Sequence, residues 1–477
     1  MNFVLFLPET ILCGIILFYL CLSLFKNTPD AKTLLGFAVV GALAVLGAAI
    51  YSMGFSGELF FGTYKSDLLA QSFKVIISLG LLFTIFLSSI NLQIPKNRTL
   101  EYLLFLFSAT LGMVMMPSSV NWLTLYVSME LSSYSLYLLT ALRQDRLNAE
   151  SSLKYLLLGA ASSGVFLWGV SLLVGLSGSV SLSALAPLAT AGQPAFLIAL
   201  FFALFAFLFK LSASPTHFWA PDVYQSASTP VANFIATASK AAAVAVFIRI
   251  FISSGVSASL ASLLGVLAFV SMTLGNTVAL WQKDVKRLLA YSSIAQAGYI
   301  LVGLLSGTAE GYSSSLFYAL AYLLMNAAVF LIVTIIAKSI QNDNPKMSDF
   351  NGLAERAPKL SLLLLLSLLS LAGIPPLAGF TGKWILFTAA MSKGHWFLVL
   401  WAVLNSVVSL FYYLTLVKHA YLEKPTVKEP IQINFVGQLL CLVLMLAIVG
   451  LGVFPNQFIV IAQRALESTA LSAGGVF

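Results

Sequence analysis

The chain has 477 residues, of which 60% are hydrophobic and only 9% are charged, and its mean hydropathy is +0.96. A soluble globular domain carries about 25% charged residues, so this composition excludes that class. The net charge of +8 is therefore interpreted as a bias of lysine and arginine among the loops of a membrane protein, and not as a nucleic-acid-binding surface.

Apolar runs of about 18 or more residues recur along the whole chain, and each is long enough to cross roughly 30 Å of hydrocarbon. Barrel strands alternate over about 10 residues, whereas these runs are uniformly apolar. The sequence predicts an all-α polytopic membrane protein with about fourteen transmembrane helices. The expected spans are 3–25, 34–54, 68–91, 100–116, 118–141, 151–176, 195–226, 229–253, 258–281, 286–306, 312–338, 359–392, 396–422 and 433–456. No positively charged region precedes the first span, so we expect no cleaved signal peptide.

The seventh and twelfth spans, 195–226 and 359–392, are too long for simple helices. Each contains a proline-bearing interruption, at Ser212 to Pro215 and at Gly373 through Pro375-Pro376 to Gly379. Proline removes a helical hydrogen bond, and a broken span is tolerated only where protein or water covers the freed backbone. Paired broken helices in two halves of opposite orientation are typical of a transport site near the midplane.

The two broken helices define an expected domain organisation. Residues 1–99 supply helices one to three, and residues 100–254 form a first five-helix repeat, helices four to eight. Residues 255–423 form a second, inverted repeat, helices nine to thirteen, and residues 424–477 supply helix fourteen. This organisation places the interrupted helix at the fourth position of each repeat.

Lysine and arginine are distributed very unevenly between alternate loops. Sixteen of the 25 lie in one set of loops, while the opposite set has only Lys65, Arg249, Lys393 and Arg464. The positive-inside rule makes the rich set cytoplasmic, so both termini are expected on the periplasmic side of a bacterial inner membrane. Lys286 counts among the cytoplasmic loop charges, as do Lys26 and Lys428. Lys74, inside the third span, is interpreted as a side chain that reaches back to the interface.

Four charged side chains lie deep inside apolar segments or at a break within them: Glu130, Lys210, Lys240 and Lys383. A lysine near the middle of a bilayer costs about 2.5–3.5 kcal/mol on insertion scales, so such residues mark proton or ion paths. Burial disfavours the charged form of a lysine, and a neighbouring carboxylate restores it. The alternatives are a structural ion pair or a neutral acid for Glu130, and snorkelling or purely structural roles for the lysines.

Two further residues are candidates of lower rank. Lys154 follows Glu150 by four residues, which also fits an ordinary exposed ion pair on a helix. His217 lies inside the first break and is either a proton relay or structural. Asp222 is expected to cap or mark the end of that span. Tyr318, Tyr322 and Asn326 share one helix face, where they either hold water between charged groups or form a polar packing stripe.

No cofactor site is expected on this chain. Cys13, Cys21 and Cys441 all lie in apolar runs, no CxxC occurs, and the three histidines do not cluster. No glycine-rich nucleotide-binding loop follows a strand.

Three runs resemble the antiporter-like subunits of respiratory complex I: His217–Val231, Lys286–Gly298 and Leu368–Lys383. The third run, with Leu7-Pro-Glu9 at the start of the chain, is most similar to subunit N, the family of NuoN and NdhB. The resemblance covers nearly the whole chain. The D-type chain of Mrp sodium/proton antiporters shares the Pro-Pro…Gly-Phe…Gly-Lys pattern, and such an antiporter chain is the alternative.

The resemblance implies a fourteen-helix subunit with an inverted repeat in a membrane arm, beside other antiporter-like and small subunits. It implies proton translocation driven by quinone reduction, in a translocase whose NADH, FMN, iron–sulfur and quinone sites lie on partner subunits. It assigns the proton-carrying positions to Glu130, Lys210, Lys240 and Lys383, and adds Lys154. We hypothesise that Glu130 and Lys210 form a switchable pair that feeds Lys240 and then Lys383. A purely structural membrane subunit is the third alternative.

Overall fold

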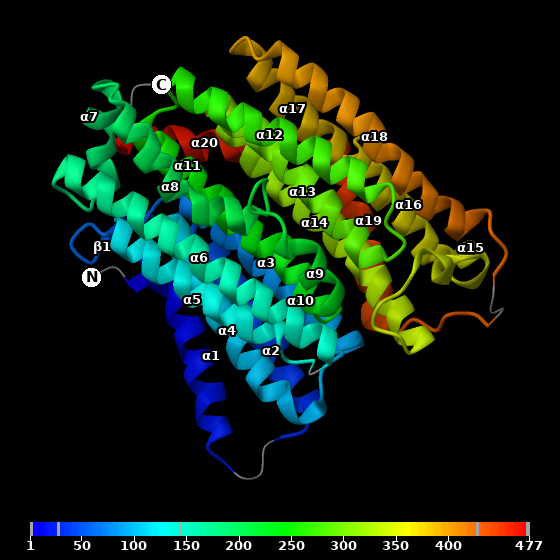
Figure 1. Cartoon of the computed structure of the whole chain (residues 1–477). Coiled ribbons are helices and arrows are strands. Elements are labelled where there is room, and N and C mark those ends of the chain that lie inside the picture. The colour runs from blue at the N-terminus through cyan, green and yellow to red at the C-terminus, as the bar shows by residue number, and fades with distance from the viewer. Residues whose placement is uncertain (1–2, 26–28, 144, 426–428, 474–477) are drawn as a thin grey trace.

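The computed structural model describes residues 3–25, 29–143, 145–425 and 429–473, and nearly all of this chain is helical (Figure 1). In chain order the helices are α1 (Leu7–Ser23), α2 (Ala31–Ser52), α3 (Leu68–Ile90), α4 (Thr99–Met115), α5 (Trp122–Thr140), α6 (Arg146–Ser177), α7 (Leu185–Thr190), α8 (Pro194–Leu211), α9 (Trp219–Ser226), α10 (Thr229–Phe234), α11 (Lys240–Ser254), α12 (Ala258–Ala279), α13 (Val285–Leu304), α14 (Ala309–Ile340), α15 (Leu353–Arg356), α16 (Pro358–Ala372), α17 (Ala378–Ser392), α18 (Trp396–Tyr421), α19 (Phe435–Val453) and α20 (Asn456–Ala473). The two strands β1 (Gly57–Leu59) and β2 (Tyr64–Ser66) form an antiparallel hairpin between α2 and α3.

Among the described residues, eleven helices are long and apolar enough to span a membrane. The remaining expected spans coincide with α5 (19 residues), with α13 (20 residues) and with the pair α16 and α17 (15 residues each). These helices carry many of the polar side chains described below, or are short because the chain is broken between them. The all-helical membrane class is confirmed.

Several helices begin at a polar residue that caps the free backbone N–H groups of the first turn. Asp67, Asp145 and Asp284 each accept a hydrogen bond from the backbone of the third residue that follows, at the start of α3, α6 and α13. Such caps satisfy donors that have no partner within the helix and typically stabilise it by about 1 kcal/mol. They show why these acidic residues stand at the borders of apolar runs.

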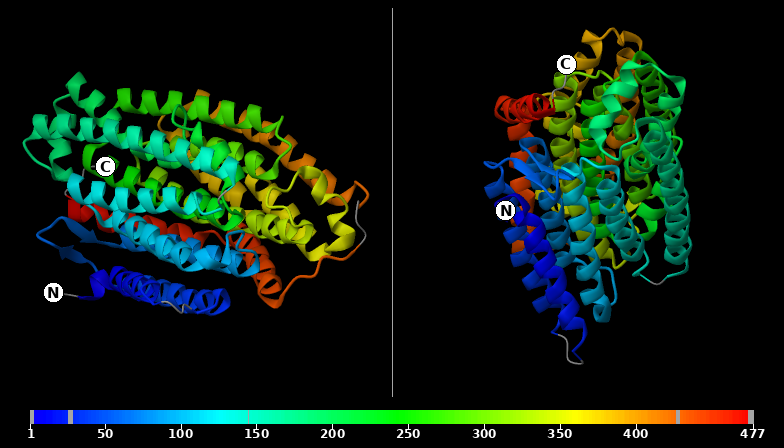
Figure 2. Two further views of the ribbon diagram at one scale, coloured as in Figure 1. Left: turned by 60° about the horizontal axis from the view of Figure 1, so that its bottom comes forward. Right: turned by 90° about the vertical axis from the view of Figure 1, so that its left-hand side faces the viewer.

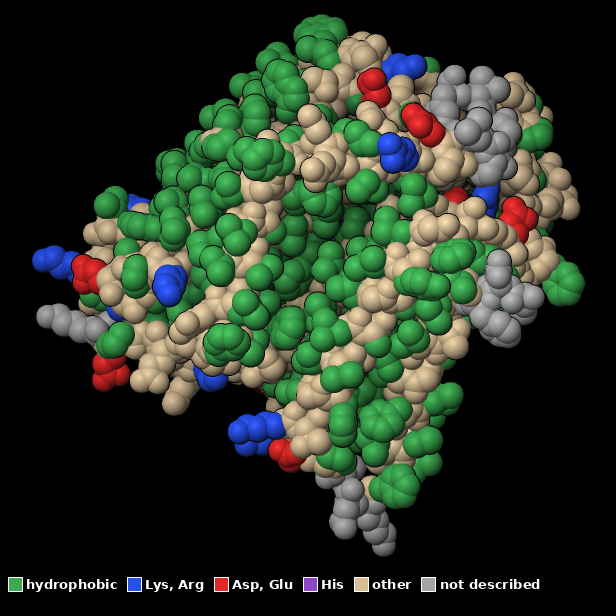
Figure 3. All heavy atoms as spheres, turned by 180° about the vertical axis from the view of Figure 1, so that it is seen from behind, with side chains coloured by type: hydrophobic (Ala, Val, Ile, Leu, Met, Phe, Trp, Pro, Cys, Tyr) green, Lys and Arg blue, Asp and Glu red, His purple; other side chains and the backbone are tan. Residues whose placement is uncertain are grey.

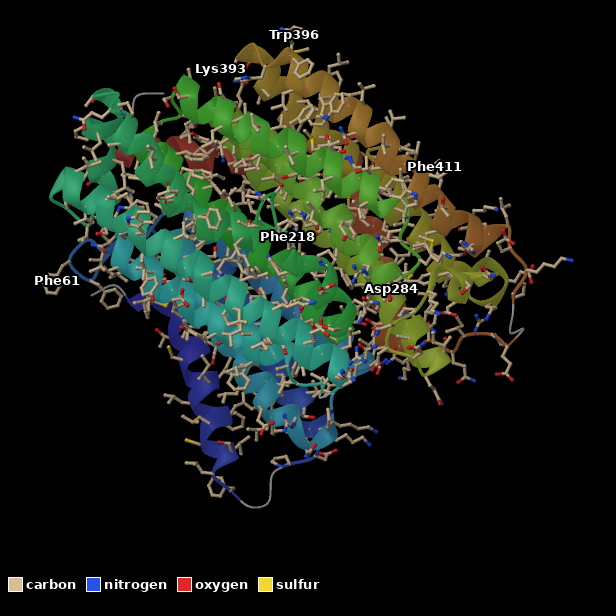
Figure 4. All side chains as sticks on the ribbon, in the orientation of Figure 1. Phe61, Phe218, Asp284, Lys393, Trp396 and Phe411 are labelled. Atoms are coloured by element: carbon tan, nitrogen blue, oxygen red, sulfur yellow. The ribbon has the colours of Figure 1, made fainter. Side chains whose placement is uncertain are left out.

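Both expected helix interruptions are present. After α8 the chain turns at Ser212, whose φ is 54°, and helix resumes only at Trp219 in α9. After α16 it turns at Gly373, with a φ of 92°, and resumes at Ala378 in α17. Figure 4 labels Phe218, in the first break, between Asp284 and Lys393, which lie toward opposite ends of the helices. The first break therefore lies between the two ends of the bundle, and Phe218 is exposed on the side of the molecule.

A further irregularity was not predicted. The expected span 229–253 is divided into α10 and α11 by a single π-helical turn, Ile235–Ser239, directly before Lys240. π-Helical turns are rare and frequently occur at functional sites. The turn consists of isoleucine, alanine, threonine and serine residues, and it lacks the proline that signals the other two irregularities in the sequence.

The two most buried spans run through the centre of the molecule. In both Thr229–Ser254 and Ala309–Ile340, 94% of the most apolar window is buried, compared with 33% for α2 and α18. In Figure 3 a broad hydrophobic surface separates charged side chains that gather at two opposite ends. This pattern is the one that a lipid-embedded bundle requires.

One end of the bundle carries the hairpin, α7 and α20. Figure 2 shows α20 lying across this end, turned away from the direction of α19. The sequence predicted a single helix in residues 424–477, and α20 is a second one. It lies against α14 and α3, and the Thr469 hydroxyl donates to Asp67 Oδ2 at 3.3 Å. The sequence of α20 is too polar to be recognised as a span, which is why it was missed.

Three interpretations of charged residues are wrong. Lys74 does not reach the interface, because it is completely buried in an ion pair with Glu9. Lys286 is not an exposed loop residue, since it is buried and donates to the Ala227 carbonyl at 2.9 Å. Arg249 is also buried, paired with Asp67. Lys26, Lys428 and both chain ends lie outside the described residues.

Candidate functional site

Lys240, the first residue of α11, is held by the middle of α13. Its Nζ donates to the carbonyl oxygen of Ser293 at 2.8 Å and to the Ser293 Oγ at 3.0 Å. The side chain is 1% exposed, and no carboxylate of the described chain pairs with it. The π-helical turn that precedes Lys240 sets the rotation of α11 relative to α10 and so helps to aim this lysine. Lys240 is thus a buried amine with neutral oxygen ligands.

Lys383, in α17, reaches back to the end of α16. Its Nζ donates to the carbonyl oxygens of Leu371 and Ala372, both at 3.0 Å, and to Ser406 Oγ at 3.1 Å. The two carbonyls belong to the last residues of α16, where a helix leaves its C=O groups unpaired and carries a partial negative charge. The break after α16 therefore creates the ligands of Lys383. The ring of Tyr299 lies 4.4 Å from the same Nζ.

Helix α13 connects the surroundings of the two lysines. Three residues after Ser293, Gln296 donates from Nε2 to the Leu371 carbonyl at 3.2 Å, the same oxygen that accepts from Lys383. The Tyr318 hydroxyl of α14 donates to Gln296 Oε1, and the Tyr322 ring stacks beside Tyr318. Polar side chains of two adjacent helices thus fill the space from Lys240 to Lys383.

The predicted stripe on α14 is only partly used. Tyr318 bonds to Gln296, whereas the buried Tyr322 hydroxyl has no partner among the described residues. Asn326 donates back to the Tyr322 carbonyl of its own helix at 2.9 Å. Tyr318 and Tyr322 therefore face the lysines, and the Asn326 amide is satisfied locally.

Lys210 lies in the last turn of α8 and is 4% exposed. Its Nζ donates to Ser132 Oγ of α5 at 2.9 Å. Glu130 is close enough to act electrostatically on Lys210, although no ion pair joins them in the described chain. Its Oε1 is buried and has no hydrogen-bond partner there. Glu130 and Lys210 are thus close to each other without a direct ion pair, and the lysine binds Ser132 instead.

Hydrogen bonds do not link all candidates into one line. Within the described residues, the bonds of Lys210 lead to α5, whereas those of Lys240 lead to Ser293 and onward to Tyr224. His217, in the first break, is buried, and its Nδ1 has no partner in the same part of the chain. Sequence reasoning thus placed His217 correctly in the interior, but the structure does not join it to the lysines.

Lys154 forms the exposed pair that its spacing suggests. Its Nζ lies 2.8 Å from Glu150 Oε1, and the side chain is 47% exposed. Asp222 in α9 supplies a second carboxylate at 3.1 Å and also binds Arg287 of α13 at 2.8 Å. The interpretation of Asp222 as an end marker is wrong, because it lies in the first turn of α9 and connects α6 with α13.

Exchanging Lys154 for alanine is expected to change stability little. Ion pairs at this exposure contribute about 0–1 kcal/mol, and Arg287 still compensates Asp222 in the variant. Thermal unfolding of the purified assembly should therefore shift slightly at low salt and not at all at high salt. A large loss at both salt concentrations would contradict this description of the Lys154 environment.

Two buried ion pairs lie near the hairpin, apart from the lysine line. Lys74 Nζ lies 2.7 Å from Glu9 Oε1, with both side chains 0% exposed. Arg249 binds Asp67 through two nitrogens, at 2.6 and 2.8 Å, and donates to the Pro117 carbonyl at 2.7 Å. Sequence reasoning missed both pairs, because their partners are 65 or more positions apart in the numbering and the residues lie at the ends of spans.

The partners of the lysines were also missed. Ser132, Ser293 and Ser406 are serines within helices, a residue type too common in this chain to single out. Gln296 was the available signal, since an amide in the middle of an apolar helix needs a partner. Among the described residues, no group of three or more histidines, cysteines and acidic residues is arranged to hold a metal.

Comparison with known proteins gives consistent results. The family model described as NADH:quinone oxidoreductase/Mrp antiporter, TM matches residues 119–409. NADH-quinone oxidoreductase subunit N 2 of Syntrophobacter fumaroxidans is 43% identical over 473 residues, covering 98% of this chain and 100% of that protein. Subunit N of Heliobacterium modesticaldum is 39% identical over 481 residues, with the same coverage.

Solved structures agree with these relatives. A chain of respiratory complex I from Thermus thermophilus with bound aureothin has a TM-score of 0.82 and 32% identity, covering 96% of this chain and 99% of that chain. A chain of the Mrp complex from Dietzia sp. has a TM-score of 0.89 over 100% of both chains, but only 19% identity, so it shows a shared fold alone. The chain belongs to the family of NADH:quinone oxidoreductase/Mrp antiporter membrane proteins.

Proposed function

We propose that this chain is the N-type antiporter-like subunit of a proton-translocating NADH–quinone oxidoreductase. The near-full-length identity to two proteins named subunit N supports the assignment. Its partners would be the other membrane-arm subunits and the lipid bilayer. Quinone, NADH, FMN and iron–sulfur clusters would bind to partner subunits, and this chain would act in the translocase without a redox centre of its own.

The single observation that carries the proton-transfer role is the set of ligands around Lys240 and Lys383. Both amines are buried, and both are held by carbonyl and hydroxyl oxygens. An ammonium without a counter-charge is costly in such a place, so a lysine there can hold or release its proton at modest cost. A structural ion pair would instead require a carboxylate at each lysine, and neither has one among the described residues.

In this mechanism Glu130 controls Lys210. Its approach would favour the ammonium form of Lys210, and its withdrawal would release the proton toward Lys240 and then Lys383. A change of two pKa units corresponds to about 2.7 kcal/mol. Moving one charge across 100 mV requires about 2.3 kcal/mol, so one such switch is matched to one proton. Lys154 and His217 would be accessory proton-exchanging groups.

The inverted repeat and fourteen crossings belong to the same proposal, and two glycines support it. A Cβ on Gly112 of α4 would lie 2.6 Å from the Ser128 carbonyl oxygen and 2.6 Å from the Ser132 nitrogen of α5. A Cβ on Gly275 of α12 would lie 2.7 Å from the carbonyl oxygen and 2.6 Å from the nitrogen of two residues in α13, Tyr291 and Ala295. Each glycine thus touches two residues four apart.

The correspondence has a consequence for the site. Midway between the two contacted residues stand Glu130 in α5 and Ser293 in α13. The repeat would therefore place the controlling carboxylate and the ligand of Lys240 at matching positions. The two broken helices would match in the same way. Fourteen crossings and the loop charges would then place both termini on the periplasmic side of the bacterial inner membrane.

An Mrp-type sodium/proton antiporter chain is the second candidate, because the description of the matching family model includes Mrp antiporters as well. Purifying the assembly through a tag on this chain separates the two. Flavin and iron–sulfur absorbance, with NADH-driven proton uptake that does not need sodium, would support the proposal. Sodium-dependent exchange without a flavin or iron–sulfur partner would overturn it.

A further inference from the structure

A second buried group of titratable side chains lies away from the lysine line, between the N-terminal helices and the hairpin. Lys74 of α3 donates to the Tyr64 hydroxyl at 2.6 Å and contacts Glu9 Oε1 of α1 at 2.7 Å. The Tyr64 hydroxyl in turn donates to Glu9 Oε1. Lys74 and Tyr64 thus both contact the same carboxylate oxygen of Glu9. These three side chains come from three elements, and we call them the Glu9 cluster.

The second oxygen of this carboxylate is not used. Glu9 Oε2 is buried and accepts no hydrogen bond from any described residue, although Glu9 is 0% exposed. A buried carboxylate oxygen without a donor is costly. The geometry of the pair is therefore not that of a saturated structural ion pair, whose remaining lone pairs are satisfied by further donors.

A line of serines leads from this cluster to Lys210. Ser118 lies beside the Tyr64 hydroxyl, although the Ser118 Oγ makes no hydrogen bond within the described residues. The Oγ of the next residue, Ser119, lies 3.4 Å from Ser128 Oγ. One helical turn along α5 from Ser128, about 6 Å, Ser132 binds Lys210. These four serines, two between α4 and α5 and two in α5, are all buried.

The charged groups around the cluster are few. On α1 the next titratable residue is Cys13, one turn from Glu9, and at the start of α3 the Asp67 carboxylate is compensated by Arg249. The hairpin that carries Tyr64 also carries Glu58 and Lys65, which line a surface cavity of about 720 Å³. The cluster is therefore one or two residues away from an aqueous surface at this end of the bundle.

We propose that the Glu9 cluster is a proton-exchanging site that connects Lys210 with the side of the membrane on which the hairpin lies. This inference rests on the proposed proton-transfer function of Lys210. It explains why the hydrogen bonds of Lys210 lead to α5 and not to Lys240. It also gives a role to the Leu7-Pro-Glu9 start of the chain, which the lysine line does not use.

The transfer steps conserve atoms and charge. A proton from the Lys210 side would pass along the serine hydroxyls, with water bridging the gaps between Ser132 and Ser128 and between Ser119 and Ser118. It would then bind the Tyr64 hydroxyl, which gives up its own proton to Glu9 Oε1. Independently, breaking the Nζ–H bond of Lys74 and forming an O–H bond on Glu9 Oε1 turns the charged pair into an amine and a carboxylic acid. Tyr64 offers a second route for the same proton, because it accepts from Lys74 and donates to Glu9. No oxidant or reductant is needed.

The test compares variants of the assembled complex in proteoliposomes by the rate of NADH-driven proton uptake per assembled complex. The double variant Glu9→Gln/Lys74→Met removes both charges together, so it leaves no unpaired buried charge. Tyr64→Phe removes only the bridging hydroxyl and keeps the ion pair. Its matched control is Tyr102→Phe in the neighbouring helix α4, which deletes another buried tyrosine hydroxyl. This hydroxyl is hydrogen-bonded to Ser88 of α3 at 2.6 Å.

We expect proton uptake to fall by about tenfold or more in the double variant and in Tyr64→Phe, because a positioned proton donor or acceptor commonly contributes 10²- to 10⁴-fold. Tyr102→Phe should pump like the wild type. If the double variant does not assemble, Tyr64→Phe decides: uptake equal to that of Tyr102→Phe overturns the inference. A double variant that assembles and pumps normally does so as well, and makes the pair structural.

A parallel Lys210→Ala variant separates the two claims. If Lys210→Ala abolishes pumping while Tyr64→Phe and the double variant retain it, only the role of the Glu9 cluster fails. If Lys210→Ala also pumps normally, the proposed function itself fails.

Discussion

Exchanging Lys210 for alanine is expected to lower NADH-driven proton uptake by about a hundredfold, the lower end of what a positioned acid–base group contributes. Alanine cannot carry a proton, and it leaves Ser132 Oγ without its 2.9 Å donor. Glu130 in α5 then has no basic side chain in α8 on which to act. The measurement is the initial rate of proton uptake by proteoliposomes at equal amounts of assembled complex.

The control for this variant is Lys393→Ala, which removes a lysine from an exposed position between α17 and α18 (Figure 4). It should pump like the wild type. Uptake by Lys210→Ala at the control rate would show that no proton passes through Lys210. If the Lys210→Ala complex does not assemble, the Ser132→Ala variant is measured instead. This variant keeps the lysine and removes only its hydroxyl partner.

Exchanging Asp67 for alanine is expected to destabilise the protein by about 3–5 kcal/mol, the cost of leaving a buried charge without its partner. Arg249 is 4% exposed, so its guanidinium cannot turn to solvent, and only the Pro117 carbonyl remains as a ligand. The same change removes the N-cap of α3 and one of the two acceptors of the Thr469 hydroxyl. The yield of assembled complex and its thermal unfolding report the effect.

A compensating variant distinguishes this explanation from a general defect. Asp67→Asn/Arg249→Met removes both charges and should recover most of the stability, since replacing a buried ion pair by neutral groups is often close to neutral. If the double variant is as unstable as Asp67→Ala, the pair is not the cause. Lys393→Ala, at an exposed position far from this pair in the sequence, is a suitable surface control.

The pair also predicts a pH dependence. Burial alone would raise the pKa of the Asp67 carboxyl, but the neighbouring Arg249 guanidinium more than offsets this effect. The pKa therefore lies below its ordinary value of 3.8. A carboxyl with a depressed pKa contributes stability that is present above the unfolded value and is lost as the pH falls through the folded one. The contribution of this pair is thus complete at neutral pH and is lost in acid, as the pH falls from 3.8 through the lower pKa of the folded state.

Much of the fold could be predicted from the sequence, for a physical reason. In lipid the backbone leaves only helices as an option for long apolar runs, and proline or glycine marks where such a run must break. Both interrupted helices were found in this way. The π-helical turn before Lys240 was not found because it carries no proline or glycine, and the lateral helix α20 was not found because it lacks a strongly apolar pattern.

The candidate site was predictable in its charges and not in its contacts. Glu130, Lys210, Lys240 and Lys383 stand out because charge inside a span is costly. What holds them is set by helix packing that one sequence does not reveal. Lys383 binds carbonyls freed by a break eleven residues earlier, and Lys240 binds a serine 53 residues later.

The same limit explains the errors made for single charges. Lys74 has the spacing of an interfacial lysine, and only the position of Glu9 in the folded chain shows that it is a buried pair. Arg249 and Lys286 stand near the ends of spans, where a loop position is the simplest assumption, yet both are covered by neighbouring helices. Near the ends of helices, the position of a residue within a predicted span is therefore a poor guide to its burial in the bundle.

The most direct test of the central claim, that buried lysines carry protons through this chain, is proton uptake by a complex with Lys240→Met. Methionine is an unbranched apolar side chain one atom shorter than lysine, and Ser293 loses only a donor. We predict a complex that assembles and oxidises NADH in the presence of an uncoupler, but takes up protons at least about tenfold more slowly than the wild type. Wild-type proton uptake by this variant would contradict the claim.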